Sequence, residues 1–223
     1  MQLTKSLFQL ISKFLAQRKI YLTRSLSFRQ RPDKLAISFD FVRHTTLELC
    51  YEEIILKNIK GNVAELGVYK GEFSQKLNHL FSDRKIYLFD TFEGFDDKDI
   101  EIEKAQNFSD GKQDFSDTSI DLVMQQMTYP ENCIIKKGFF PETAEGIDDR
   151  FCFVSLDTDL FEPIYQGLLF FYPKLEKGGY IFVHDFNNDG YKGTRHAVTK
   201  FCSENKISYV PIPDNSGTVI ITK

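Results

Sequence analysis

The sequence predicts an α/β fold built on a seven-stranded, mostly parallel sheet that ends in an antiparallel hairpin. Apolar runs of strand length alternate with segments of helical spacing along the 223 residues. Four of these runs end in polar residues, at the position where ligand sites form in open parallel sheets. The last two runs are joined only by the turn at residues 214–217, and strands without a helix between them must pair antiparallel.

The first half of the predicted domain alternates between helix and strand. Thr45 or Thr46 is the expected N-cap of the first helix. Gly67 and Gly71 mark a tight turn between the first strand and the second helix. The elements expected here are a helix over residues 45–59, a strand over 63–66, a helix of about ten residues after Gly71 and a strand over 85–90.

The second half opens with a long polar segment. Residues 91–131 are acidic and too long for a simple connection, so we expect a lid or specificity insertion that contains helices. Ser116 or Asp117 is the expected cap of a helix over 118–127, and Asp159 of the helix after the fourth strand. The remaining elements are strands over 133–136, 151–157, 180–185, 207–212 and 218–221, and helices over 161–172 and 194–204.

Charge is unevenly distributed along the chain. The net charge of −4 gives no indication of nucleic-acid binding. Residues 1–34 hold eight Lys and Arg and a single acid, which leaves 20 basic and 31 acidic residues for the rest. We therefore divide the chain into a basic amphipathic arm, residues 1–35, and a domain, residues 36–223. The arm is expected either to pack on the body or a second subunit of a homo-oligomer, or to lie on an anionic membrane surface.

The four cysteines carry no metal-binding or redox spacing. They are far apart in the sequence, and none belongs to a Cys-x-x-Cys pair. We interpret them as reduced core residues of a cytoplasmic protein.

The polar strand ends define the candidate site. Because parallel strands bring their carboxyl ends to one edge of a sheet, we expect these side chains to lie close together. Any one of them could cap a helix, but a packed core has no use for a group of lone carboxylates. They are Glu65, Asp90, Asp157 and the pair His184-Asp185.

The chemistry of these residues suggests two halves of a site. Glu65 beside the glycine turn argues against a phosphate ligand and for one with hydroxyls or a positive charge. Asp90, at the end of the second strand, is placed to accept hydrogen bonds from a ribose diol. Asp157 and Asp185 come from adjacent strands and offer the oxygen ligands that suit a hard divalent cation such as Mg²⁺.

Six motifs in this order resemble the macrocin O-methyltransferase family, the TylF/MycF/NovP type. The resemblance covers roughly residues 40–223 and implies a Rossmann-like class I methyltransferase fold. It also implies use of S-adenosylmethionine, in many members with Mg²⁺, to methylate sugar hydroxyls. The motifs are AELGVYKG at 64–71, FDTFEG at 89–94, GFFPET at 138–143, LDTDLF at 156–161, FYPKL at 171–175 and GGYIFVHD at 178–185.

The resemblance assigns roles to the cofactor residues. Glu65, Gly67 and Gly71 match the cofactor loop, and Asp90 matches the residue that binds the ribose hydroxyls. The adjoining Thr91 and Phe92 belong to the same cofactor motif, with Phe92 packing near the adenosyl group. Arg195, in a further stretch similar to the family, is expected near the substrate mouth, and His196 at the surface.

The resemblance also assigns the catalytic and metal residues, with one departure. Asp157 matches a metal ligand that also serves as general base. His184 and Asp185 fall where the family has two consecutive acids, and imidazole favours softer metals than Mg²⁺. Three alternatives follow: Mg²⁺ held by Asp157, Asp185 and water; a metal resembling Mn²⁺ with His184 as a ligand; or no metal, with His184 as the base. A histidine satisfied by a backbone partner is the simplest interpretation.

These observations favour an S-adenosylmethionine-dependent O-methyltransferase that acts on a hydroxyl of a small molecule or glycan, in particular a sugar. One alternative is a methyltransferase-like protein that has lost its chemistry through His184 and serves as a cofactor-binding or scaffold subunit. A nicotinamide-dependent dehydrogenase is less consistent with the sequence, because the third glycine of the dinucleotide fingerprint is missing and the C-terminal hairpin is unexplained.

Overall fold

The computed structural model describes residues 10–15, 17–18 and 40–223, in two units, Met1–Lys34 and Leu35–Lys223. In the first unit residues 10–15 are helical, and Leu10 and Phe14 are exposed. Most of the predicted arm lies outside the described residues, so its membrane and subunit interpretations stay predictions. None of the helices described is long and apolar enough to cross a membrane.

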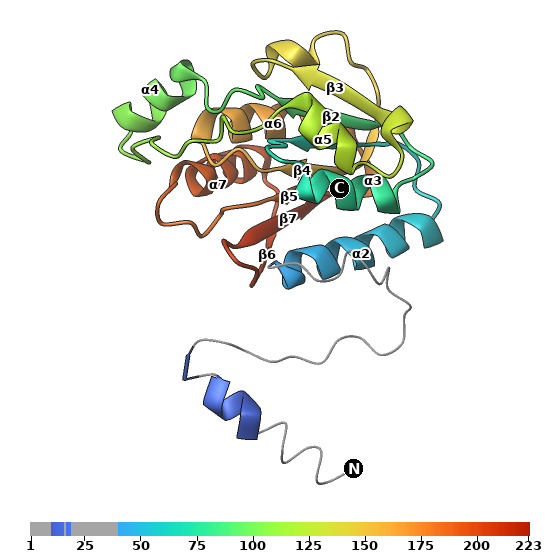
Figure 1. Ribbon diagram of the computed structural model, residues 1–223, viewed down its shortest axis with the longest axis horizontal. Helices are drawn as coiled ribbons and strands as arrows, with labels where there is room; N and C mark the ends of the chain where they lie inside the picture. The colour runs from blue at the N-terminus through green and yellow to red at the C-terminus, as the bar shows by residue number, and fades with distance from the viewer. Residues whose placement is uncertain (1–9, 16, 19–39) are drawn as a thin grey trace. The chain divides into compact units, whose positions relative to one another are not determined.

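The second unit is a seven-stranded sheet with helices on both faces (Figure 1). The strand order is β3-β2-β1-β4-β5-β7-β6; β1 to β5 are parallel, and β7 pairs antiparallel with both β5 and β6. This confirms the predicted sheet and its C-terminal hairpin. The strands are β1 (Asn62–Leu66), β2 (Ile86–Asp90), β3 (Cys133–Lys137), β4 (Phe151–Leu156), β5 (Leu175–Val183), β6 (Val210–Ile212) and β7 (Thr218–Thr222).

The helices occupy the predicted places with some changes of boundary. The first one begins at Phe41, four residues before the expected start, and the helix expected over 118–127 is shorter. Ser119 caps that helix, so the expected caps Ser116 and Asp117 were wrong. The helices are α2 (Phe41–Leu56), α3 (Glu72–Leu80), α4 (Asp97–Ala105), α5 (Ile120–Gln126), α6 (Phe161–Lys174) and α7 (Gly193–Asn205), with short 3₁₀ turns at Pro130–Asn132 and Glu142–Ala144.

Strand β5 begins at Leu175, five residues before the predicted start, and passes through Gly178 and Gly179. The pairing register between β4 and β5 shifts between Phe151 and Phe153. A Cβ at Gly179 would lie 2.7 Å from the carbonyl oxygen of Cys152, so only glycine permits this close approach of the two backbones.

An apolar layer packs on each face of the sheet, and the alternation of side chains along each strand determines the face toward which each site residue points. Val63 belongs to the layer under α2, α3 and α5, whereas Ala64 and Leu66 belong to the layer under α6 and α7. Successive side chains of a strand point to opposite faces, so Glu65 points toward α2 and α3. Strand β4 is buried along its whole length, as its apolar sequence predicted.

A buried ion pair joins α2 to α3. Lys76 of α3 donates to Glu48 of α2, and both side chains are almost inaccessible to solvent. Such a pair contributes little net stability, because desolvation offsets much of the attraction. It does require both partners to face each other, and this fixes the position of α2 beside the sheet.

The insertion 91–131 contains α4 and α5, and several hydrogen bonds attach it to the rest of the domain. The carboxylate of Glu103, on α4, accepts a hydrogen bond from the backbone N–H of Phe161, in the first turn of α6. Farther along, Asp117 accepts a hydrogen bond from the hydroxyl of Tyr69, and Thr118 donates to the carbonyl of Tyr69. Its role as a lid or specificity element stays a prediction.

Gly67 lies where the loop after β1 meets the end of β4. Its φ is +88°, and a Cβ would lie 2.1 Å from the carbonyl oxygen of Asp157. We therefore expect Gly67→Ala to lower the free energy of unfolding by about 3 kcal/mol or more, since strain and a backbone clash combine. Chemical denaturation followed by circular dichroism measures the change.

Gly146→Ala is the matched control. Gly146 also has a positive φ, +75°, but a Cβ there would meet nothing within 4 Å. Its cost is expected to be about 1 kcal/mol, from backbone strain alone. Equal losses in the two variants would show that the close approach at Gly67 is unimportant.

Candidate active site

Two adjoining cavities lie at the carboxyl ends of the strands, beside the switch point between β1 and β4. One is lined mainly by aromatic and apolar groups, and we call it the apolar cavity. The other is lined mainly by charged and polar groups, and we call it the polar cavity. They share five residues: Gly67, Tyr69, Phe115, Asp157 and Asp159.

The carboxylate of Asp90, at the end of β2, holds the glycine loop after β1 by hydrogen bonds to backbone N–H groups. One oxygen of its carboxylate accepts hydrogen bonds from the backbone N–H groups of Val68 and Tyr69, at 2.6 and 2.9 Å. The other accepts from the N–H of Phe92 at 2.7 Å, and Asp90 also lines the apolar cavity. The first oxygen uses both of its lone pairs in this way, and the oxygen that meets Phe92 keeps one with which Asp90 can accept from a ligand. Gly71, with φ +83°, is the N-cap of α3.

Thr91 and Phe92, the two predicted cofactor residues that follow Asp90, differ in their access to the cavities. Thr91 lines the apolar cavity, and its hydroxyl donates to the carbonyl of Gly94. The ring of Phe92 packs into the buried layer under α3 and α5 and lines neither cavity. Arg195 also lines neither; its guanidinium lies 4.2 Å above the ring of Phe186. His196 is exposed, as expected.

Glu65 is buried at the edge of the polar cavity. Its carboxylate is 2% exposed and accepts a hydrogen bond from the hydroxyl of Ser74. Burial raises the pKa of Glu65 to about 8, although Ser74 and the nearby Arg43 act in the opposite direction. A group with a positive charge entering the cavity would stabilise the ionised form of Glu65.

Asp157 is held between two cations. Nη1 of Arg43 donates to one carboxylate oxygen at 2.8 Å, and Nδ1 of His184 lies 3.0 Å from the other. The side chain of Asp157 is half-buried, which by itself raises the pKa of its carboxyl, but Arg43 and His184 outweigh that effect and hold this pKa well below the usual range. Asp157 therefore stays ionised at the junction of the two cavities.

Arg43 is the site residue that sequence reasoning missed. It lies on α2, is 5% exposed, and also donates through Nη2 to the hydroxyl of Ser155 at 3.1 Å. Its spacing contained a signal: Arg43, Leu47 and Ile54 fall on one helical face, and all are buried. A buried arginine needs an acid partner, so this face pointed to a buried carboxylate elsewhere in the chain.

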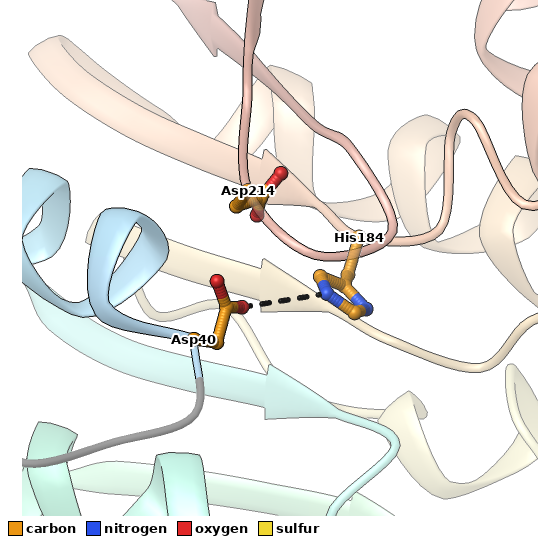
Figure 2. A group of neighbouring side chains, drawn as sticks. All are labelled: Asp40, His184 and Asp214. Carbon is orange, nitrogen blue, oxygen red and sulfur yellow. Dashed lines mark ion pairs between the residues drawn. The ribbon is translucent and has the colours of Figure 1, made fainter. Parts of the chain in front are cut away.

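His184 bridges acids on both sides of its ring, rather than meeting a backbone partner. Nδ1 lies 2.6 Å from an oxygen of Asp185 as well as 3.0 Å from Asp157, and Nε2 lies 3.6 Å from Asp40. Figure 2 shows the ring, at the end of β5, turned toward Asp40, at the start of α2. Burial opposes charge on the ring, but the carboxylates raise the pKa of His184 to about 12. His184 is therefore an imidazolium at neutral pH and cannot serve as the base there.

Asp159 belongs to the site and does not cap α6. The N-cap of α6 is Leu160, and Glu103 receives the N–H of Phe161, so the expected capping role of Asp159 was wrong. Asp159 lies at the shared edge of both cavities, with φ +60°. Burial and the neighbouring Asp185 and Asp157 raise its pKa well above the usual range. The physical reason is that an ionised carboxylate is too costly beside two others.

The geometry offers two groups of potential metal ligands, and most of their donor atoms already take part in hydrogen bonds or ion pairs within the described residues. Asp157, His184 and Asp185 form one group, and Asp40, His184 and Asp214 form the other. Nδ1 of His184 lies between two carboxylate oxygens, so it carries a proton and has no lone pair for a metal. In the second group, Asp214 already accepts from the N–H and hydroxyl of Thr218.

The charge around Asp157 also opposes a dication. Arg43 is ion-paired to the carboxylate that would be the central ligand, and its charge would repel a metal there. The residues in this arrangement do not fit Mg²⁺ or Mn²⁺, and the mechanism proposed below involves no metal.

Asp99 places an unpartnered carboxylate oxygen at the apolar cavity. It lies on α4 and is 7% exposed, and its Oδ1 has no hydrogen-bond partner in the described part of the chain. Burial, with the nearby Asp96 and Glu162, raises the pKa of Asp99 to about 7. An unsatisfied buried carboxylate at a cavity indicates a position that suits a hydrogen-bond donor from a ligand.

The sheet order, the glycine loop and the acids at the strand ends define a class I methyltransferase-type α/β fold. Residues 31–217 match the family described as macrocin O-methyltransferase (TylF). The match spans most of the chain, and the chain belongs to this family.

Two curated relatives and one solved structure that are similar to this chain are named as O-methyltransferases. A demethyldecarbamoylnovobiocin O-methyltransferase of Streptomyces niveus is 24% identical over 164 residues, 65% of this chain and 60% of that protein. An 8-demethyl-8-(2,3-dimethoxy-alpha-L-rhamnosyl)-tetracenomycin-C 4′-O-methyltransferase of Streptomyces olivaceus is 23% identical over 79% of this chain and 70% of its own. The solved structure of the O-methyltransferase NovP has a TM-score of 0.68 at 20% identity, covering 82% of this chain and 80% of its own. This chain thus spans about 60% of the length of the first of these relatives.

Replacing Asp99 tests whether the ionised form of its buried carboxylate lowers the free energy of unfolding. Its pKa is about 7 in the folded state against an ordinary value of 3.8, so the folded state holds a proton that the unfolded state has lost. Stability therefore falls as the pH rises from about 4 to about 7. We expect Asp99→Asn to raise the free energy of unfolding by up to about 4 kcal/mol at pH 8 and by little at pH 4.

Denaturant unfolding across this pH range measures the effect. Asp97→Asn is the control, because Asp97 is exposed on the same helix. If the increase in the free energy of unfolding caused by Asp99→Asn did not grow with pH, the ionisation of the buried Asp99 would not be what destabilises the fold.

Proposed function

We propose that this chain transfers a methyl group from S-adenosylmethionine to a hydroxyl of a small molecule or glycan, most specifically of a sugar. The observation that carries the proposal is the ionised carboxylate of Asp157 at the junction of the two cavities. Membership in the macrocin O-methyltransferase family supports the reaction type. The rhamnosyl group in the name of one relative supports a sugar as acceptor.

The apolar cavity suits the adenosine part of the cofactor. Its aromatic rings provide contact surface for a base, and the free oxygen of Asp99 suits the exocyclic amino group of adenine. Asp90, at the end of β2, can accept hydrogen bonds from the ribose hydroxyls. The methionine part would then pass Gly67 into the polar cavity, where Glu65 can pair with its ammonium group.

The reaction is an in-line displacement. A lone pair of the acceptor hydroxyl forms the new O–CH₃ bond while the S–CH₃ bond breaks and sulfur keeps the electron pair. The hydroxyl proton passes to Asp157. Although Arg43 and His184 make Asp157 a weak base, the attacking oxygen becomes strongly acidic as it acquires the methyl group, so a weak base is sufficient. The main task of the protein is to align acceptor, methyl group and sulfur.

Asp157→Asn tests the proposed base. We expect the variant to bind S-adenosylmethionine within about threefold of the unaltered chain, while methyl transfer falls by about 10² to 10⁴. Calorimetry measures binding, and formation of S-adenosylhomocysteine with a panel of rhamnosides and other deoxysugar glycosides measures transfer. Asp148→Asn, at a fully exposed position, is the control.

The results separate the proposed enzyme from its alternatives. Absence of S-adenosylmethionine binding by the unaltered chain would rule out the proposal. Cofactor binding without transfer to any acceptor of the panel would favour a cofactor-binding scaffold protein. Full activity in a correctly folded Asp157→Asn variant would remove Asp157 as the base.

Glu65 links cofactor binding to proton release. Near pH 7 its carboxyl is mostly protonated, because its pKa is about 8. An ammonium group stabilises the ionised form, so binding should release up to about one proton, and cofactor affinity should rise as the pH approaches 8. Calorimetry in buffers of different ionisation enthalpy counts the released protons.

Glu65→Gln should abolish this proton release and weaken cofactor binding by about tenfold or more. Glu145→Gln is the control, because Glu145 is exposed and lines neither cavity. Proton release that persists in Glu65→Gln would place the linked group elsewhere.

A further inference from the structure

Arg43 is built into the site as a permanent positive charge. A guanidinium does not lose its proton in proteins, and this one is 5% exposed. Its plane is supported by the ring of Phe73, 4.0 Å from the guanidinium carbon. Its two terminal nitrogens are spent on Asp157 and Ser155, both contributed by β4 and the residue that follows it.

The polar cavity otherwise gathers acids. Glu65, Asp157, Asp159 and Asp185 line it, and several carboxylates cannot ionise close together without a compensating cation. Arg43 meets one oxygen of Asp157 and His184 meets the other, so the chain supplies this compensation from its own side chains.

We propose that the guanidinium of Arg43 takes the place of the divalent cation implied by the family resemblance, so that this chain transfers methyl groups without a bound metal. The inference rests on the proposed function and specifies its electrostatics. Arg43 is a positioning residue: it acts on the acceptor through Asp157, by fixing the direction of that carboxylate.

Three features of the donor atoms support this assignment. Arg43 sits at ion-pair distance from the carboxylate that a metal would need. His184 replaces the first of two consecutive acids, and its ring nitrogen toward the site lies between two carboxylate oxygens. Asp185, with φ +59°, has its other oxygen bound to the amide of Asn188 at 3.0 Å. Both oxygens of Asp157 and both oxygens of Asp185 are therefore already in contact with side chains of the domain.

The first measurement needs no variant. Manganese is added to the unaltered chain, with and without S-adenosylmethionine, and bound Mn²⁺ is counted by electron paramagnetic resonance. We expect no stoichiometric binding at about 1 mM Mn²⁺, and less than about a twofold change in methyl transfer after EDTA treatment. One Mn²⁺ per chain that disappears in Asp157→Asn, or transfer that EDTA abolishes and Mg²⁺ restores, would overturn the inference.

Variants then test whether Arg43 and His184 occupy the place of a metal. Arg43→Gln should lower kcat by about 10- to 100-fold with little change in cofactor affinity, because the carboxylate loses its orientation. The double variant Arg43→Gln, His184→Asp exposes a group of acids and should gain Mn²⁺ binding. A folded double variant that binds no Mn²⁺ would contradict the proposal that the guanidinium of Arg43 takes the place of a metal ion.

Arg150→Gln is the matched control. Arg150 is also ion-paired, with Glu176, but it precedes β4 and lies at the opposite end of that strand from Asp157. It should keep its activity and gain no metal binding. Cofactor calorimetry on the unaltered chain separates the two levels: loss of S-adenosylmethionine binding defeats the proposed function, whereas normal binding with a metal requirement defeats only this inference.

Discussion

The ion pair between Arg43 and Asp157 is the interaction on which the arrangement of the site depends. It joins the buried Arg43 of α2 to the half-buried Asp157 after β4, across 114 residues of sequence. Removing one partner from such a pair leaves a buried charge and typically costs about 3–5 kcal/mol. The position of α2 is therefore as important to the chemistry as the sheet, and the buried pair Glu48–Lys76 holds that helix in place.

Much of the fold and part of the site could be predicted from the sequence, for a simple reason. Strand periodicity is local, and parallel strands of a sheet share one edge, so Glu65, Asp90, Asp157 and Asp185 were expected together. The partners of these residues could not be predicted in the same way. Arg43 meets an acid far along the chain, and no local pattern specifies which of several acids that is.

The same limit applies to the capping residues. Asp159 and Asp117 stand at positions where short polar side chains usually cap helices. Tertiary contacts override this preference: Glu103 reaches α6 from another helix, and Asp117 bonds to Tyr69 instead. The site also contains buried carboxyl groups whose ionisation destabilises the fold, such as Glu65 and Asp99, and burial raises the pKa of each. Local rules fail mostly at residues that line the cavities, where binding competes with stability.

The attachments of the insertion on either side of residues 110–114 have a consequence for changing acceptor preference. Glu103 at one side and Asp117 with Thr118 at the other fix the ends of a short stretch, residues 110–114, whose residue Gln113 reaches the polar cavity. Loops held at both ends tolerate exchange better than the elements that hold them. Residues 110–114 are thus a suitable place for loop grafting and sequence libraries. New sequences there would reshape the acceptor side of the polar cavity, and they would leave Arg43, Asp157 and the loop at Gly67 unchanged.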